Sequence, residues 1–193
     1  MGLFDFLKKS DKKQETVQLQ SKKEANIAKI KQYINIPDSI ADSIADKVAD
    51  IDNITINKDL DVESRVNELM KIYESLTDDQ KRTRGGRYVI IHIAEVCFSE
   101  RWIEDAFDNF NFAMQFKDTV GNPFLHLRLG QLNYLVQNKD KMHDELSRAL
   151  IMDGEPIFKD EDPKLIEMVK RILKEPENGS WAEYDGQDWA ITK

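Results

Sequence analysis

The sequence predicts an all-α protein, and three observations carry that prediction. Glycine and proline are scarce, with 8 and 5 copies in 193 residues, which favours long helices over many tight turns. Apolar residues recur at three- and four-residue steps, as the buried face of a helix requires. One apolar pattern also returns after 36 residues, a period typical of stacked helical hairpins. The pattern is Ala106, Phe110 and Ala113, followed by Met142, Leu146 and Ala149.

Composition limits the classes of partner. Charged residues make up 33% of the chain and apolar residues 40%, which is ordinary for a soluble helical protein. The net charge of −8 argues against general nucleic-acid binding and suits solubility or a basic protein partner. Eight lysines and four acidic residues give residues 1–31 a charge of +4, which leaves −12 for residues 32–193. The single cysteine, Cys97, excludes an intramolecular disulfide.

The ends of the chain carry few structural signals. No apolar run approaches the roughly 18 residues of a membrane span, and the start has its apolar residues before its lysines, the reverse of a secretory signal. We therefore expect a cytoplasmic protein without stable membrane insertion. Residues 1–20 are expected to form a flexible terminus, with a weak contact to a membrane surface or partner as the alternative.

The first helical segment covers residues 21–50. Pro37 interrupts it, and Asp38 or Ser39 can cap a second helix that carries the repeat SIAD-SIAD-KVAD. Residues 51–60 are expected to form a loop with a short extended piece. Three aspartates lie on one stripe of the second helix: Asp42, Asp46 and Asp50. We prefer a solvated face for this stripe, with metal ligands or a contact for a basic partner as the alternatives.

The remaining helices follow from apolar spacing and capping residues. A helix is expected from Asp61 to about Leu76, and residues 77–86 break it. The run from Arg87 to Phe98 has β-branched residues that suit a strand, but its length and context favour a helix. It leads through a charged turn into an amphipathic helix from Trp102 to Phe116.

A second hairpin has the same plan. Asn122 is a good cap and Pro123 suits the first helical position. Helices are therefore expected at 124–136 and 141–152, with a final helix near 164–173.

The two hairpins resemble the tetratricopeptide repeat (TPR) family over about residues 87–155. That motif places a small residue on the first helix, which is Gly130 in the later unit and Ala94 in the earlier one. It places alanine, an aromatic residue or leucine, and alanine on the second helix. Ala106, Phe110 and Ala113 match this in the earlier unit, and in the later unit Ala149 fills the last alanine position after Met142 and Leu146. Small residues let crossing helices approach closely. The chain departs from the family at the tryptophan position, which is His126, and at the closing proline, displaced to Pro156.

The predicted organisation is one helical domain over residues 21–174 with a C-terminal tail, 175–193. Two repeat units are too few for a free-standing stack, so the N-terminal helices and the tail are expected to cover it. The tail places three aromatic residues among five acidic ones and one lysine. These aromatic residues are Trp181, Tyr184 and Trp189. We expect them to pack on the protein's own helices, with docking on a partner as the alternative.

The resemblance also implies a binding groove on the first helix of each hairpin. It would expose Tyr88, Glu95 and Ser99 from the first unit, and Phe124, Leu127, Gln131 and Tyr134 from the second. The alternative is that Phe124 and Leu127 are covered by the N-terminal helices or the tail. With the tail, the predicted partner-binding residues are Tyr88, Glu95, Phe124, Gln131, Tyr134, Trp181, Tyr184 and Trp189.

Other candidate sites have simpler interpretations. Metal-ligand spacing is absent from the three histidines, His92, His126 and His143, so no metal or cofactor is expected. Cys97 is expected to be an inert buried thiol. Residues 81–87 carry four positive charges around Gly85 and Gly86. We expect a solvated loop there, with an anion-binding nest of backbone N–H groups as the alternative. Residues 153–162 concentrate acidic side chains, as a solvated run or a contact for a basic partner.

The predicted function is protein binding, not catalysis. The stretches FLHLRLGQLNYL and IFKDEDPKLIEMVKRIL also resemble small bacterial TPR-like immunity proteins. That resemblance implies an immunity protein that binds and neutralises a basic toxin domain. One alternative is a TPR-like adaptor or co-chaperone that grips a peptide, although the groove is expected to lack the basic clamp of that class. A hydrolase using Glu95 or His92 is the least favoured alternative, because no convergent polar groups are evident.

Overall fold

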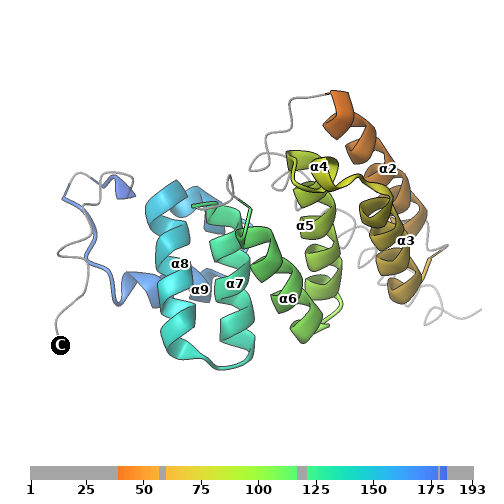
Figure 1. Cartoon of the computed structure of the whole chain (residues 1–193). Coiled ribbons are helices and arrows are strands. Elements are labelled where there is room, and N and C mark those ends of the chain that lie inside the picture. Colours follow the sequence, from red (N-terminus) through yellow and green to blue (C-terminus); the bar gives the residue numbers. More distant parts are fainter. Residues whose placement is uncertain (1–38, 57–59, 117–120, 178, 182–193) are drawn as a thin grey trace, which may run out of the picture.

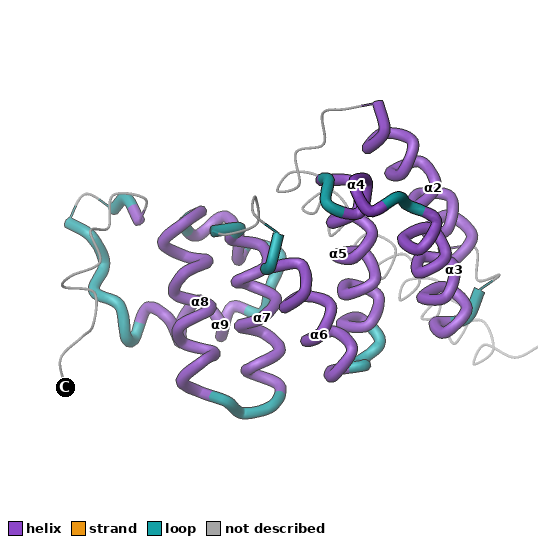
Figure 2. The backbone as a smooth tube through the Cα atoms, viewed as in Figure 1, coloured by secondary structure: helices purple, strands orange, loops and turns teal. Residues whose placement is uncertain are grey.

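The computed structural model describes residues 39–56, 60–116, 121–177 and 179–181, and every element in those ranges is a helix (Figure 2). The eight α-helices confirm the predicted all-α class. They are α2 (Ser39–Ile56), α3 (Val62–Ser75), α4 (Asp78–Lys81), α5 (Arg84–Ser99), α6 (Ile103–Met114), α7 (Pro123–Leu135), α8 (Lys139–Asp153) and α9 (Pro163–Lys170), with a 3₁₀ turn, η1 (Glu155–Phe158).

Two helical hairpins form the centre of the molecule (Figure 1). Helix α5 pairs with α6, α7 pairs with α8, and α6 packs on α7 to join the hairpins. Helices α2 and α3 pack against α5 at one end, and α9 and η1 pack against α8 at the other. The hairpins are therefore covered at both ends.

The two hairpins turn in the same way. Arg101 and Gln137 both lie in the left-handed region, with φ of 66° and 60°. The next residue in each turn donates its N–H back to a helix carbonyl, over 2.8 Å from Trp102 to Cys97 and 2.9 Å from Asn138 to Asn133. This is the Schellman ending of a helix. Each residue of the second turn lies 36 residues after its counterpart in the first, so the sequence period is also a period of backbone geometry.

The repeated apolar pattern lies in the core. Its six members are at most 4% exposed: Ala106, Phe110, Ala113, Met142, Leu146 and Ala149. Gly130 is needed where α7 crosses α8, because a Cβ there would lie 2.5 Å from Leu146 Cδ2 and 3.1 Å from the Leu146 backbone nitrogen. Its counterpart Ala94 is fully buried on α5. The expected close approach at the small residue is confirmed for the second hairpin.

The core has two parts. The first joins α2, α3, α5, α6 and one face of α7, and includes Val48 and Leu69, both fully buried. The second joins α7, α8, η1 and α9, and includes Trp181, which is 4% exposed. The preferred interpretation of the tail, packing on the protein's own helices, is thus confirmed for Trp181. Tyr184, Trp189 and residues 1–20 lie outside the described residues.

Two expectations about connecting segments were wrong. Residues 51–56 do not form a loop, because α2 continues to Ile56 and Ile51 adds a further buried residue to its apolar face. The expected break at 77–86 is present, because α3 ends at Ser75, and it contains the short helix α4, which Thr77 and Gln80 begin with a reciprocal capping box. The region of 81–87 is not an open loop either, because Gly85 and Gly86 are buried in the first turn of α5. A Cβ on Gly86 would lie 2.4 Å from the Lys81 carbonyl oxygen, so that glycine serves helix packing.

Candidate protein-binding groove

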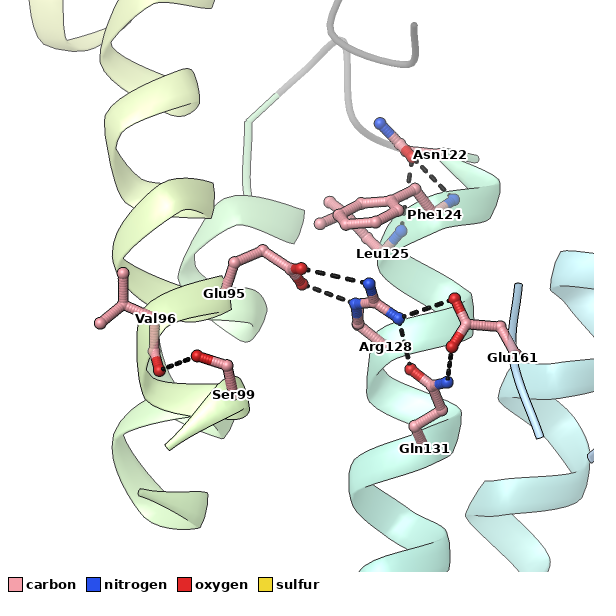
Figure 3. Close-up of polar contacts among 9 residues, drawn as sticks. All are labelled: Glu95, Val96, Ser99, Asn122, Phe124, Leu125, Arg128, Gln131 and Glu161. Atoms are coloured by element: carbon pink, nitrogen blue, oxygen red, sulfur yellow. Dashed lines mark hydrogen bonds and ion pairs between the residues drawn. The ribbon is translucent and has the colours of Figure 1, made fainter. Parts of the chain in front are cut away.

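A buried polar network lies between the two hairpins, centred on Arg128 of α7 (Figure 3). The Arg128 side chain is 1% exposed. Its Nε donates to Glu95 Oε1 over 2.6 Å and its Nη2 donates to Glu95 Oε2 over 3.1 Å. This fork-to-fork pairing fixes both side chains and ties α5 to α7.

The other edge of the Arg128 guanidinium reaches the segment before α9. Nη1 donates to Gln131 Oε1 over 2.7 Å and to Glu161 Oε1 over 3.1 Å. Gln131 Nε2 donates to Glu161 Oε2 over 2.7 Å, which closes the triangle. One arginine therefore connects both hairpins to the C-terminal end of the fold.

Aromatic rings cover the guanidinium. Its Cζ lies 5.1 Å from the ring centroid of Phe98 and 5.0 Å from that of Phe124, both within the range of a cation–π contact. Burial alone would lower the pKa of Arg128, but the carboxylates of Glu95 and Glu161 outweigh it and hold that pKa above its ordinary value. The guanidinium thus stays charged and keeps its orientation.

A groove of about 260 Å³ opens beside this network. Gln131 belongs to both, so the network forms part of the groove wall. Tyr134, one turn further along α7, lines the groove with 38% of its surface exposed. Arg101, in the left-handed turn after α5, adds an exposed cation. The complete lining is Phe98, Ser99, Arg101, Gln131, Tyr134, Leu135, Asp162 and Leu165.

The structure places the predicted groove residues at different depths. Gln131, Tyr134 and Ser99 line the groove together. Glu95 is 9% exposed and is held by Arg128 instead of facing a partner. Tyr88, Phe124 and Leu127 are at most 1% exposed, so none of them lies open in the groove. Phe124 belongs to the core that includes α2 and α3, and Leu127 to the core that includes Trp181. Trp181 lies in the C-terminal core and does not line the groove.

The 36-residue period also relates the network residues to one another. Glu95 and Gln131 occupy equivalent positions in the two hairpins, as do His92 and Arg128. Three of these four residues meet in the polar network, because Arg128 donates to both Glu95 and Gln131.

Sequence reasoning missed Arg128, Glu161 and Arg101. A signal was present for the first, because Arg128 is a lone charge inside the apolar run FLHLRLGQL, and Glu95 is a lone acid inside RYVIIHIAEVCF. A buried charge needs a partner of opposite sign. Pairing these two isolated charges would have predicted the contact between α5 and α7. Glu161 offered no such signal, because it lies in a generally acidic run.

The other candidate residues behave as structural groups. His126 is 6% exposed, and its Nδ1 lies 2.6 Å from Glu145 Oε2, which agrees with the preferred packing role. Burial, with a smaller contribution from Asp105, raises the pKa of the Cys97 thiol to about 11. Within the described ranges, no group of three or more histidine, cysteine or acidic side chains could hold a metal ion. No described helix has the length and apolar character to cross a bilayer.

Comparisons with protein-family models, with curated proteins and with solved structures found no match. The resemblance to the TPR family and to immunity proteins therefore remains a prediction from the sequence.

Proposed function

We propose that this protein binds another protein through the groove between α5, α7 and the segment before α9. The observation that carries the proposal is Tyr134, a large ring left 38% exposed on a wall that the Arg128 network locks in place. Exposed aromatic residues beside polar groups are typical binding hot spots. A fixed wall also reduces the entropy lost on association.

In its most concrete form, the proposal is an immunity protein that neutralises a basic toxin domain. The support is the net charge of −8, together with exposed acidic side chains on α6: Glu104, Asp105 and Asp108. Opposite charges would speed the encounter, and Tyr134 with its neighbours would then hold the complex.

Site-specific crosslinking tests the groove directly. Tyr134 is replaced by the photo-crosslinking residue p-benzoylphenylalanine, and the products formed in cells of the source organism are identified by mass spectrometry. Met152 is the matched control, because it is 41% exposed on α8 and does not line the groove. We expect one stoichiometric basic protein at Tyr134 and none at Met152. Absence of any product specific to Tyr134 would contradict the proposal.

Neutralisation is tested with the captured protein. We expect the captured protein to be toxic when expressed alone and harmless when this protein is co-expressed. Tyr134→Ala should weaken the complex by about 2 kcal/mol, roughly a 30-fold rise in Kd. A captured protein that is not toxic would contradict the immunity role while leaving protein binding intact.

Arg101 favours a second candidate, an adaptor that grips a peptide end. Carboxylate clamps of the TPR family use lysine, arginine and asparagine, and Arg101 supplies one such cation to the groove. Many unrelated crosslinked proteins at Tyr134, with affinity lost when a peptide's terminal carboxylate is amidated, would support the adaptor over the immunity protein.

A further inference from the structure

A second groove lies between α3, α4 and α6 and shares no lining residue with the first. Its volume is about 470 Å³. The lining combines three aromatic rings with two cations: Tyr73, Asp78, Lys81, Arg82, Phe112, Gln115 and Phe116. The two cations belong to the basic run of residues 81–87.

The aromatic wall is an edge-to-face ladder. The ring of Phe112 lies 6.5 Å from that of Tyr73 at 87°, and 5.4 Å from that of Phe116 at 70°. Both contacts have the geometry that aromatic pairs prefer. Phe112 nevertheless remains 39% exposed, so the ladder presents an apolar surface to an incoming side chain.

The cationic rim stands against this ladder. Lys81 Nζ lies 5.5 Å from the centroid of the Tyr73 ring, and Arg82 is exposed. Asp78 is the acidic member of the lining, so the lining has a formal charge of +1 in a protein of −8. The charge of this groove is therefore opposite to that of the whole protein.

The rim is also fixed before any ligand arrives. The capping box of Thr77 and Gln80 sets the start of α4. At the end of α4, the Lys81 carbonyl lies so close to Gly86 that a Cβ there would be only 2.4 Å away. The end of α4 thus packs with its backbone against Gly86 of α5. This contact fixes the position of Lys81 and Arg82 at the groove.

We propose that this groove binds an acidic segment of another protein that carries an aromatic side chain. The aromatic side chain packs against Phe112, and neighbouring carboxylates pair with Lys81 and Arg82. A nucleic acid also has rings and negative charge, but it carries a phosphate on every nucleotide, and the groove offers only two cations in a protein with a net charge of −8. The proposal concerns a different surface from the α5–α7 groove and does not rest on the function proposed for that groove.

The test uses defined peptides and the full-length protein. The probe is a fluorescein-labelled 12-residue peptide of alternating aspartate and tryptophan with glycine spacers, followed by fluorescence anisotropy. Its twin has asparagine in place of aspartate. We expect the acidic probe to bind at least about tenfold more tightly than its twin, with an affinity that falls as salt rises.

Charge-reversal variants locate the binding. Lys81→Glu with Arg82→Glu should weaken the acidic probe at least about tenfold. The matched control, Lys139→Glu with Lys141→Glu, changes the net charge equally at two exposed positions of α8 and should have little effect. Equal weakening by both pairs would overturn the proposal, because it would show a general charge effect.

The aromatic wall is tested separately. Phe112→Ala should weaken the probe about tenfold. Trp102→Ala, which removes a ring of similar exposure outside the groove, should not. Because Phe112 is exposed, both variants should keep the wild-type circular dichroism spectrum. Equal binding of the asparagine twin would overturn the proposal, as would tighter binding of a single-stranded DNA 12-mer. Tighter binding of a peptide of residues 182–193 would also overturn it, since the occupant would then be this protein's own tail.

Discussion

Replacement of Arg128 by methionine should destabilise the fold strongly. Methionine fills similar space between Phe98 and Phe124 but carries no charge and no donor. The change removes four hydrogen bonds, two to Glu95 and one each to Gln131 and Glu161. It also leaves two carboxylates without their cation, with side chains only 9% and 12% exposed.

The expected loss is about 4 kcal/mol of unfolding free energy. Hydrogen bonds to charged groups contribute about 1.5–3 kcal/mol each, but these four share one cation and do not add. Removal of one partner from a buried ion pair costs about 3–5 kcal/mol, which sets the scale. For a domain of this size the melting temperature should fall by roughly 8–16 °C.

Urea denaturation followed by circular dichroism measures this loss, and Arg148→Met is the matched control. Arg148 pairs with Asp144 at 3.0 Å, but both side chains are about half exposed, at 52% and 51%. An exposed helix pair contributes about 0.3–0.5 kcal/mol. A loss for Arg128→Met within 1 kcal/mol of that control value would refute the argument that the network stabilises the junction of the hairpins.

A triple variant separates charge from packing. If the cost comes from carboxylates that have lost the Arg128 cation, then Glu95→Gln and Glu161→Gln should restore at least half of the stability lost in Arg128→Met. No recovery in the triple variant would mean that the loss arises from the aromatic packing around the guanidinium.

Three further substitutions or reactions test the hairpins and the core. Gly130→Ala should lower the unfolding free energy by about 1–2 kcal/mol, because the clash with Leu146 outweighs the roughly 1 kcal/mol gain in helix propensity; an unchanged urea midpoint would contradict the close crossing. Gln137→Gly should raise that free energy by about 0.5–1 kcal/mol, because glycine adopts the φ of 60° without strain. A lower melting temperature would show that residue 137 does not have this left-handed conformation. The Cys97 thiol, with its pKa raised to about 11, should react with Ellman's reagent at pH 8 only as fast as the protein unfolds. Because its folded pKa is raised, its contribution to stability should be complete below about pH 8.5 and be lost as pH rises toward 11; rapid labelling at pH 8 without denaturant would contradict its burial.

Much of the fold could be predicted because its signals are local. Asn122 and Pro123 start α7 as expected, and Asp61 caps α3 by accepting from the Ser64 N–H at 2.7 Å. Capping and apolar periodicity depend on neighbours one turn away, so the sequence displays them directly. The expected end of α2 was wrong for a tertiary reason. The end of α2 near Ile56 has weak helix formers, and tertiary packing of residues such as Ile51 overrides that propensity.

The groove was only partly predictable. Gln131 and Tyr134 were expected there and line it, whereas Tyr88 and Phe124 were expected there and are buried. Helical spacing tells which residues share a face but not how much of that face a neighbouring helix covers. Here α2 and α3, which precede the hairpins in the chain, pack on α5 and help to cover it.

The sequence by itself determined the all-helical class, the 36-residue period and the small residues at the crossings, because backbone propensity and helix spacing act over a few residues. Only the tertiary structure decided that Glu161, 33 residues after Arg128 in the chain, would join the pair that Arg128 makes with Glu95. The physical reason is that a buried charge is stable only with a partner, and the packing of the hairpins selects which carboxylates come within reach.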